Sequence, residues 1–195
     1  MQDFIGERQV NLTEMIDLPL SALVLKYADT LEKMEAFGDE SLEITHEWPT
    51  KDELKEKELD KKIKLDQVQY KIFGNSDNSL TGIGLNFTTI GTSSFMETEQ
   101  GKSDTINNAA VDISKKIVKI SVRVKEEGKK ITGLRLIDDA DANVVDINTK
   151  DEGDWATKDI PAGKEIIGLY CSTQKGDLED SIHRLGFILW NTPPS

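Results

Sequence analysis

The pattern of apolar and polar residues divides the chain into a helical front and a β-rich back. Between Leu20 and Phe37 apolar residues recur at spacings of three and four, the period of one face of an α-helix. Pro19 precedes this segment and Gly38 follows it, at positions that suit a helix start and a left-handed helix end. The apolar stripe of this predicted helix consists of Leu20, Val24, Tyr27, Leu31 and Met34.

Two roles are open for this stripe. The helix can pack on the protein's own β-domain, or it can dock in the groove of a partner protein. A second, weaker helix is predicted over Thr50–Leu65, where Thr50 and Glu53 fit a capping box but nearly every residue is charged. We expect this second segment to be a solvated linker. Because such a linker would separate the first helix from the β-domain, we predict that the first helix is a docking element.

From Val68 onward short apolar runs alternate with Gly, Asn and Asp, which indicates strands joined by turns. In Ile117–Lys125 apolar and polar residues alternate, so one face is buried and the other solvated. The polar stretch Gly91–Ala109 is predicted to be a long loop. The other predicted strands are Gln69–Phe73, Gly82–Thr88, Lys130–Ile137, Asn143–Ile147, Glu165–Cys171 and Arg184–Trp190, with a further strand led by Trp155.

No segment with a helical period follows residue 66, which favours an antiparallel β-domain over an α/β fold. We therefore predict a mainly β protein, with an acidic helical segment and linker over residues 1–65 and one antiparallel β-domain over residues 66–195. Three fragments of that domain share a pattern in which a glycine stands between apolar residues: Leu80–Phe87, Ile131–Asp138 and Ile166–Thr173. We expect each to be a strand whose glycine lets a backbone or an aromatic ring approach closely.

The overall charge excludes several classes of partner. The chain has 195 residues, with 24 Lys and Arg against 36 Asp and Glu, for a net charge of −12. Such an acidic protein has no basic face for nucleic acid or for an anionic membrane surface. The first ten residues do not resemble a secretory signal, and no apolar stretch is long enough to span a membrane. We expect a soluble, cytoplasmic protein.

Cysteine and histidine are scarce. One cysteine and two histidines exclude an intrachain disulfide and make a zinc site improbable, so no metal or cofactor is predicted. Cys171 follows Tyr170 in an apolar strand and is expected to be a buried, inert thiol. His183 and Asp180 suggest a catalytic pair, but no nucleophile motif accompanies them. We predict that His183 is a surface loop histidine and that the protein has no catalytic residues.

An acidic segment has the beginning of a calcium-binding pattern. Asp139, Asp141 and Asn143 are spaced like the first ligands of an EF-hand loop, which then needs Gly at position six and Glu at position twelve. Those positions hold Val144 and Lys150. Because Asp and Asn are ordinary turn residues, we interpret this segment as a charged hairpin turn.

Several segments in a row resemble one known family. The order "ISKKIVKISVRV", "ITGLRLIDDADANVV", "IPAGKEIIGLYCST" and "RLGFILW" is similar to the second half of a jacalin-like β-prism domain, over about residues 67–191. The best matches are Gly163–Tyr170 and Leu185–Phe187. The resemblance implies a β-prism; a β-sandwich or jelly roll has a similar texture and remains the alternative.

The resemblance also implies a site. The sugar site of the jacalin-like family is a Gly-x-x-x-Asp loop before the last strand, and Gly176 and Asp180 have that spacing here, with Asp177 between them. Two features depart from the family. The family's aspartate position is occupied by His183, three residues after Asp180, and the glycine-rich N-terminal start is missing.

We therefore interpret the protein as a non-catalytic protein–protein interaction or structural module, as in a small subunit of a larger assembly. Its partner-binding residues would be those of the helix stripe. The alternative is a carbohydrate-binding jacalin-like lectin that uses the loop Lys175–Asp180. A third, weaker hypothesis is a hydrolase with an unrecognised site.

Overall fold

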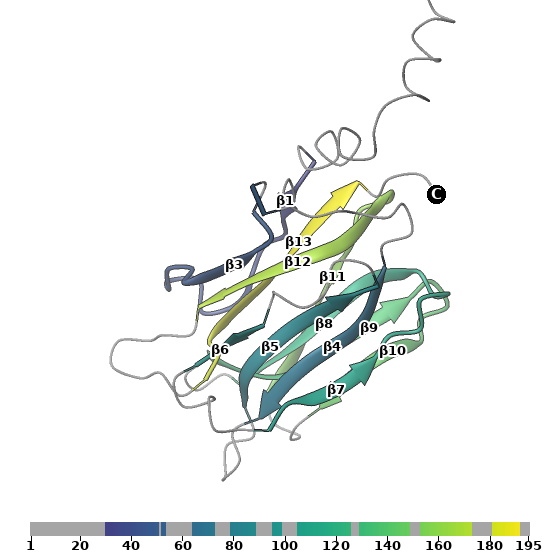
Figure 1. The fold of residues 1–195 in the computed structure, drawn as a ribbon. Helices are drawn as coiled ribbons and strands as arrows, with labels where there is room; N and C mark the ends of the chain where they lie inside the picture. The colour runs from purple at the N-terminus through teal and green to yellow at the C-terminus, as the bar shows by residue number, and fades with distance from the viewer. Residues whose placement is uncertain are drawn as a thin grey trace, which may run out of the picture.

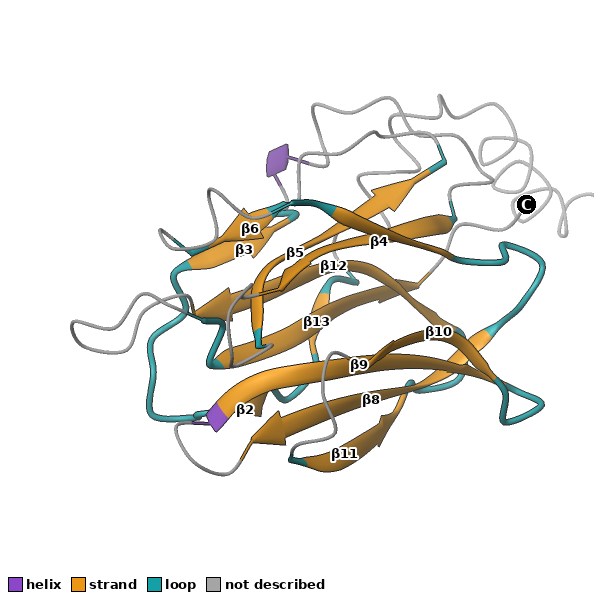
Figure 2. Cartoon of the chain, turned by 90° about the horizontal axis from the view of Figure 1, so that it is seen from below, coloured by secondary structure: helices purple, strands orange, loops and turns teal. Residues whose placement is uncertain are grey.

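Three antiparallel sheets make up the described part of the protein in the computed structural model (Figure 1). The structure describes residues 30–50, 52–53, 64–72, 79–88, 95–98, 105–125, 129–148, 153–172 and 181–191. Within these residues the numbered elements are all strands, and helical geometry is limited to residues 52–53 and a 3₁₀ position at Lys129, the two purple pieces in Figure 2. The inner faces of the three sheets share one apolar core, which gives the domain the architecture of a three-sided prism.

The first sheet is built around the two C-terminal strands. β12 (Lys164–Ser172) and β13 (Arg184–Asn191) lie side by side in its middle. β3 (His46–Trp48) pairs with β12, whereas β1 (Glu32–Lys33) and β2 (Phe37–Gly38) pair with β13. The beginning and the end of the described chain thus meet in one sheet, as Figure 1 shows.

The other two sheets have four strands each and are formed by the middle of the chain. One has the order β10 (Asn143–Asn148), β9 (Lys130–Asp138), β8 (Ile117–Lys125) and β11 (Asp154–Asp159). The other has the order β6 (Met96–Glu97), β5 (Leu80–Phe87), β4 (Leu65–Ile72) and β7 (Asn107–Ala110). Neighbouring strands are antiparallel throughout, so the predicted sheet type is confirmed.

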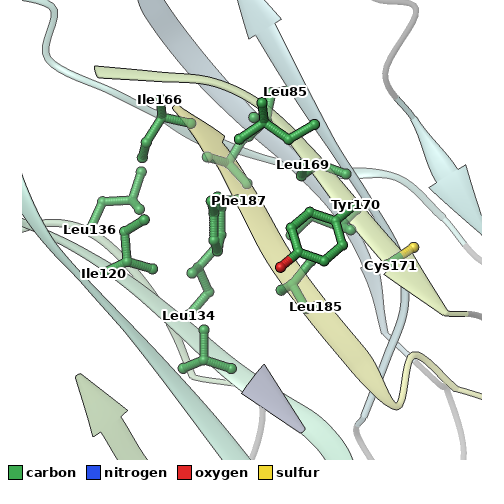
Figure 3. Packing of buried hydrophobic residues seen from close by; sticks show 14 of the residues in the cluster. Leu85, Ile120, Leu134, Leu136, Ile166, Leu169, Tyr170, Cys171, Leu185 and Phe187 are labelled. Carbon is green, nitrogen blue, oxygen red and sulfur yellow. The ribbon is translucent and has the colours of Figure 1, made fainter. Parts of the chain in front are cut away.

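The core lies between the sheets because alternate residues of each strand point inward. Phe187 of β13 is fully buried, and Figure 3 shows its ring beside Leu134, Leu136 and Ile120 of the β8–β9 sheet. Leu85 of β5, which belongs to the third sheet, is also fully buried and is part of the same apolar core. Burial of such side chains is the main stabilising contribution to a domain without disulfides.

The strands predicted from Ile117 onward are confirmed almost to the residue. Two differences concern the segment before them. β4 begins at Leu65, four residues earlier than the predicted strand Gln69–Phe73. The predicted loop Gly91–Ala109 contains β6 and most of β7, two short strands with few apolar residues. They form because each pairs with an edge of the β4–β5 hairpin, which apolar patterning does not reveal.

The prediction of a helix over Leu20–Phe37 is wrong for the part that the structure describes. Residues 32–38 run along β13 as β1 and β2, with Glu32 opposite Leu189 and Phe37 opposite Leu185. Between these two strands the amide of Met34 donates to the carbonyl of Phe187 at 2.9 Å. The edge of β13 provides hydrogen-bond partners for backbone groups that would otherwise bond within a helix. Pairing with a distant strand therefore outweighs the helical spacing of the apolar residues in this segment.

The predicted partner-binding stripe is therefore not a free helix face. Leu31 and Met34 are half-buried and pack against the core of the protein's own sheets. Leu20, Val24 and Tyr27 lie outside the described residues. For the linker, Thr50 accepts the amide of Glu53 at 3.2 Å, as the predicted capping box requires, and residues 54–63 lie outside the described part.

This packing predicts the effect of a charge at Leu31. We expect Leu31→Asp to lower the free energy of unfolding by about 1–3 kcal/mol, because a carboxylate would be placed against the apolar core. Ile113→Asp is the matched control, since Ile113 is a branched aliphatic residue with 52% of its surface exposed. Urea unfolding followed by tryptophan fluorescence measures both. Equal stability of Leu31→Asp and Ile113→Asp would contradict the packing of Leu31.

The expected role of the repeated glycines is confirmed. A Cβ added to Gly133 would lie 2.8 Å from the ring of Trp155, and one added to Gly82 would lie 2.9 Å from the ring of Phe95. Gly168 has no space for a Cβ either, because the carbonyl of Trp48 on the neighbouring strand fills it. Each of the three repeated fragments thus carries its glycine where a ring or a backbone lies directly on the sheet.

Candidate functional site

The connection between β12 and β13 is the segment in which the resemblance places a site. β12 ends at Ser172 and β13 begins at Arg184. The three predicted site residues, Gly176, Asp177 and Asp180, belong to residues 173–180 and lie outside the described part of the chain. The structure therefore describes both ends of this connection, at Ser172 and at Ser181, and the strands around those ends.

The C-terminal end of the connection is held firmly in place. Ser181, Ile182 and His183 are each at most 1% exposed, although they follow the highly polar segment Lys175–Asp180. The hydroxyls of Ser181 and Ser79 are 2.6 Å apart in a buried hydrogen bond. Asp180 is thus bonded directly to a residue that is fixed in the core.

Backbone hydrogen bonds of Ile182 and His183 tie this end of the connection to all three sheets. The amide of Ile182 donates to Leu80 of β5 at 2.9 Å, and its carbonyl accepts the amide of Ile131 of β9 at 3.1 Å. The amide of His183 donates to the carbonyl of Ser172 at 3.3 Å and so closes the base of the connection. These bonds fix Ile182 and His183, the residues between the connection and β13, relative to the three sheets.

The prediction that His183 is a surface loop histidine is wrong, because its side chain is buried. Sequence polarity suggested a loop that extends as far as β13, whereas the last three residues of the connection belong to the core. No nucleophile motif accompanies His183 and Asp180 in the sequence, so the two do not form a predicted catalytic pair.

A second segment borders the base of the connection, and sequence reasoning missed it. The turn after β2 begins with Asp39, whose amide donates to the carbonyl of His183 at 2.8 Å. Within the turn, the carboxylate of Asp39 accepts the amide of Ser41 at 3.1 Å and its hydroxyl at 2.6 Å. Arg184 of β13 donates to the carbonyl of Leu42 at 2.6 Å. The turn is therefore internally ordered and attached to the start of β13.

The exposed side chains of this turn are polar. Glu40, Ser41, Glu43 and Thr45 are all exposed, in the turn whose first residue, Asp39, bonds to His183. One glycine makes the arrangement possible: Gly38 has a φ of +94°, and a Cβ on it would collide with the backbone of His183. The sequence signal was Gly38 followed by Asp39, which fits a turn between strands as well as the predicted helix end.

Burial raises the pKa values of two side chains near this end of the prism, Tyr170 and Cys171. Burial raises the pKa of Tyr170 above its usual range, and nearby Arg184 opposes that shift. The hydroxyl of Tyr170 donates to the carbonyl of Met34. Burial also raises the pKa of the Cys171 thiol to about 12, so the expected inert thiol is confirmed.

The acidic segment after β9 is a turn, as predicted. The carboxylate of Asp138 accepts the amides of Ala140 and Ala142 at 3.0 and 2.9 Å, and Asp141 adopts a φ of +63°. Over the described ranges, His, Cys, Asp and Glu side chains form no cluster of three that could hold a metal ion. Nor does the described part contain a helix of the length and apolarity that a membrane span requires.

Comparison with known proteins by sequence finds nothing. No protein-family model matches the chain, and no curated protein matches it. The resemblance to the jacalin-like family rests on the pattern of apolar residues and glycines. Two sequences with few identical residues can share such a pattern.

Comparison by structure finds clear neighbours. The match with a mannose-binding lectin from champedak covers 82% of this chain and 96% of the lectin chain, at a TM-score of 0.54 and 8% sequence identity. A mannose-specific jacalin-related lectin from Morus nigra, solved in complex with mannose, covers 83% with 95% of its own, at a TM-score of 0.52 and 11% identity. The agglutinin of Calystegia sepium covers 81% with 95% of its own, at a TM-score of 0.54 and 12% identity.

Each of these structures is matched over nearly its whole length, so the likeness concerns a complete domain and not a single sheet. It also decides between the alternatives for the β-domain, because a β-sandwich or jelly roll lacks the third sheet. The resemblance seen in the sequence is therefore confirmed at the level of the fold: this chain has a β-prism fold like that of the jacalin-related lectins.

Proposed function

We propose that this protein is a carbohydrate-binding protein of the lectin type. Its sugar site would lie at the end of the prism where residues 173–180 connect β12 to β13, and Gly176, Asp177 and Asp180 would contribute to it. The observation that carries the proposal is the anchored base of this connection, in a fold shared with mannose-binding lectins.

The preferred interpretation of the sequence, a protein–protein interaction module, is wrong. Structural neighbours over most of the chain are jacalin-related lectins, which favours the alternative. The argument for a docking helix also fails, because Leu31 and Met34 contact the protein's own core. The expectation of a non-catalytic protein agrees with the lectin neighbours.

Two segments supply suitable chemistry at this end. A sugar is recognised mainly through its hydroxyls, which donate to carboxylates and accept from amides. Asp180 would provide a carboxylate from the connection, held close to the buried Ser181. The turn after β2 adds the exposed hydroxyls of Ser41 and Thr45 and the carboxylate of Glu43 from the neighbouring segment.

A glycan array followed by titration with mannose tests the proposal. We expect the protein to bind a subset of neutral glycans, and the amide signals of residues 39–45 and 181–184 to shift when mannose is added. The lectins from champedak and Morus nigra make mannose the first ligand to try. Absence of any glycan signal at high protein concentration would refute the proposal.

A further inference from the structure

A hollow of about 340 Å³ lies at the opposite end of the prism from the β12–β13 connection. The turn Ile113–Lys116 before β8, the turn at Gly163 before β12, and Lys64 at the start of β4 surround it. Beneath it is a smaller apolar pocket of about 40 Å³, which shares Lys64, Ile113, Lys115 and Glu165 with the hollow. In Figure 1 this is the end at which β12 begins and β13 finishes.

The hollow is positively charged in a strongly acidic protein. Lys64, Lys115, Lys116 and Lys164 line it, and Glu165 is the acid among the lining residues. The chain as a whole has a net charge of −12, so this concentration of lysines departs from the average surface. Clustered like charges repel one another unless an anion lies between them.

Among the described residues, Lys64 and Lys164 form ion pairs, whereas the charge of Lys115 only helps to lower the pKa of the neighbouring Asp112. Lys64 forms an ion pair with Glu165 at 2.8 Å, and Lys164 forms one with Glu32 at 2.7 Å. The ammonium groups of Lys115 and Lys116 are exposed, and no acid in the described ranges forms an ion pair with either. These two lysines are available to a ligand.

The backbone that carries them is ordered. The carboxylate of Asp112 accepts the amide and the hydroxyl of Ser114 at 3.0 and 2.6 Å, and the amide of Lys115 donates to the carbonyl of Asp112 at 3.0 Å. The side-chain bond from Ser114 lowers the pKa of Asp112 below its usual value. Across the hollow, nothing lies within 4 Å of the position of a Cβ on Gly163, so that backbone is open to a ligand.

An apolar surface lies beside these charges. Ile113 is 52% exposed and is one of two large apolar residues that are exposed in the described part of the chain. Its side chain lines both the hollow and the apolar pocket beneath it. The volume is at the lower end of the range for small-molecule sites. A matching ligand is small, carries a negative group, and has an apolar face next to it.

We propose that this hollow is a second binding site, specific for a sugar unit that carries a carboxylate, such as a uronate. The carboxylate would contact Lys115 and Lys116, and the C–H face of the sugar ring would cover Ile113. This proposal rests on the proposed carbohydrate binding and extends it to an acidic sugar at the other end of the prism. Acidic sugars expose both a charged group and C–H surface, which is the combination that the hollow offers.

Titration of the 15N-labelled protein with glucuronate tests the proposal, with glucose and hexanoate as the neutral and the aliphatic comparison. We expect glucuronate to shift the amide signals of residues 113–117 and 164–166, and glucose to bind at least about tenfold more weakly. Glucuronate binding should weaken as salt is raised, since exposed charges are screened.

Charge-neutralising variants show which residues are responsible. Lys115→Gln combined with Lys116→Gln should raise the Kd for glucuronate at least about tenfold, because both cationic contacts are lost. The control Lys130→Gln removes a lysine of β9 outside the hollow and should leave the Kd unchanged. Glu165→Gln should tighten binding, since it removes the acid from the lining and releases Lys64.

Three outcomes would overturn the proposal. These are hexanoate binding as tightly as glucuronate, an unchanged Kd in the double lysine variant, and glucuronate shifts confined to residues 39–45 and 181–184. Failure of the proposed neutral-sugar function is a separate result: the unmodified protein would then bind glucuronate but not mannose. Asp180→Ala should leave glucuronate binding intact, because Asp180 is joined to Ser181 at the opposite end of the prism.

Discussion

Phe187→Ala is expected to lower the free energy of unfolding by about 3–5 kcal/mol, the usual cost of truncating a phenylalanine in a core. Phe187 is fully buried, and its ring lies among Leu134, Leu136 and Ile120 of a different sheet (Figure 3). The substitution removes contacts between two of the three sheets and leaves a cavity. Because a domain is stabilised by only about 5–15 kcal/mol, this loss is a large fraction of the total.

Phe95→Ala is the matched control. Its ring lies over Gly82 and Gly84 of β5, and its side chain is only half-buried. We expect a loss below about 2 kcal/mol, because less apolar surface is returned to water. Urea unfolding monitored by tryptophan fluorescence measures both variants. A cost for Phe187→Ala no greater than that for Phe95→Ala would show that the three sheets do not share one core.

Asp180→Ala is expected to abolish glycan binding at the β12–β13 end without altering the fold. A carboxylate that accepts hydrogen bonds from two sugar hydroxyls contributes roughly 1.5–3 kcal/mol for each charge-assisted bond. Loss of both corresponds to an affinity drop of at least about a hundredfold, which places a weak sugar complex beyond detection. Calorimetric titration with the best glycan from the array measures the loss.

Two controls separate this effect from damage to the fold. Asp139→Ala removes an exposed turn carboxylate between β9 and β10 and should leave glycan affinity unchanged. The melting temperature of Asp180→Ala should match that of the unmodified protein, because the anchoring bonds come from Ser181, Ile182 and His183. Retained binding in Asp180→Ala would move the sugar site away from this connection.

The β-rich back of the chain was predictable because its strands are locally encoded. In Ile117–Lys125 apolar residues alternate with polar ones, and the structure places β8 over the same residues. The glycines at Gly82 and Gly133 were also interpretable, since a glycine inside a strand has few physical explanations besides close approach. The jacalin-like pattern follows from these two signals together.

The N-terminal strands were not predictable, because their structure depends on residues far away in sequence. Leu31, Met34 and Phe37 have the spacing of a helix face, yet Phe37 pairs with Leu185 across the sheet. Short strands gain most of their stability from the edge to which they add, and that edge exists only after β12 and β13 have folded. The same reason explains the missed strands β6 and β7.

The sequence by itself determined the class of the domain, because strand alternation and turn residues are local properties, whereas the sugar site at the segment that ends at Asp180 stays a prediction. Only the tertiary structure decided that Ser181–His183 is buried and that the turn at Asp39 lies beside it. It also decided that Lys64, Lys115 and Lys164, from three separate segments, surround one hollow. A site assembled from distant segments depends on how the sheets pack against one another. The alternation of apolar and polar residues within a single strand does not predict that packing.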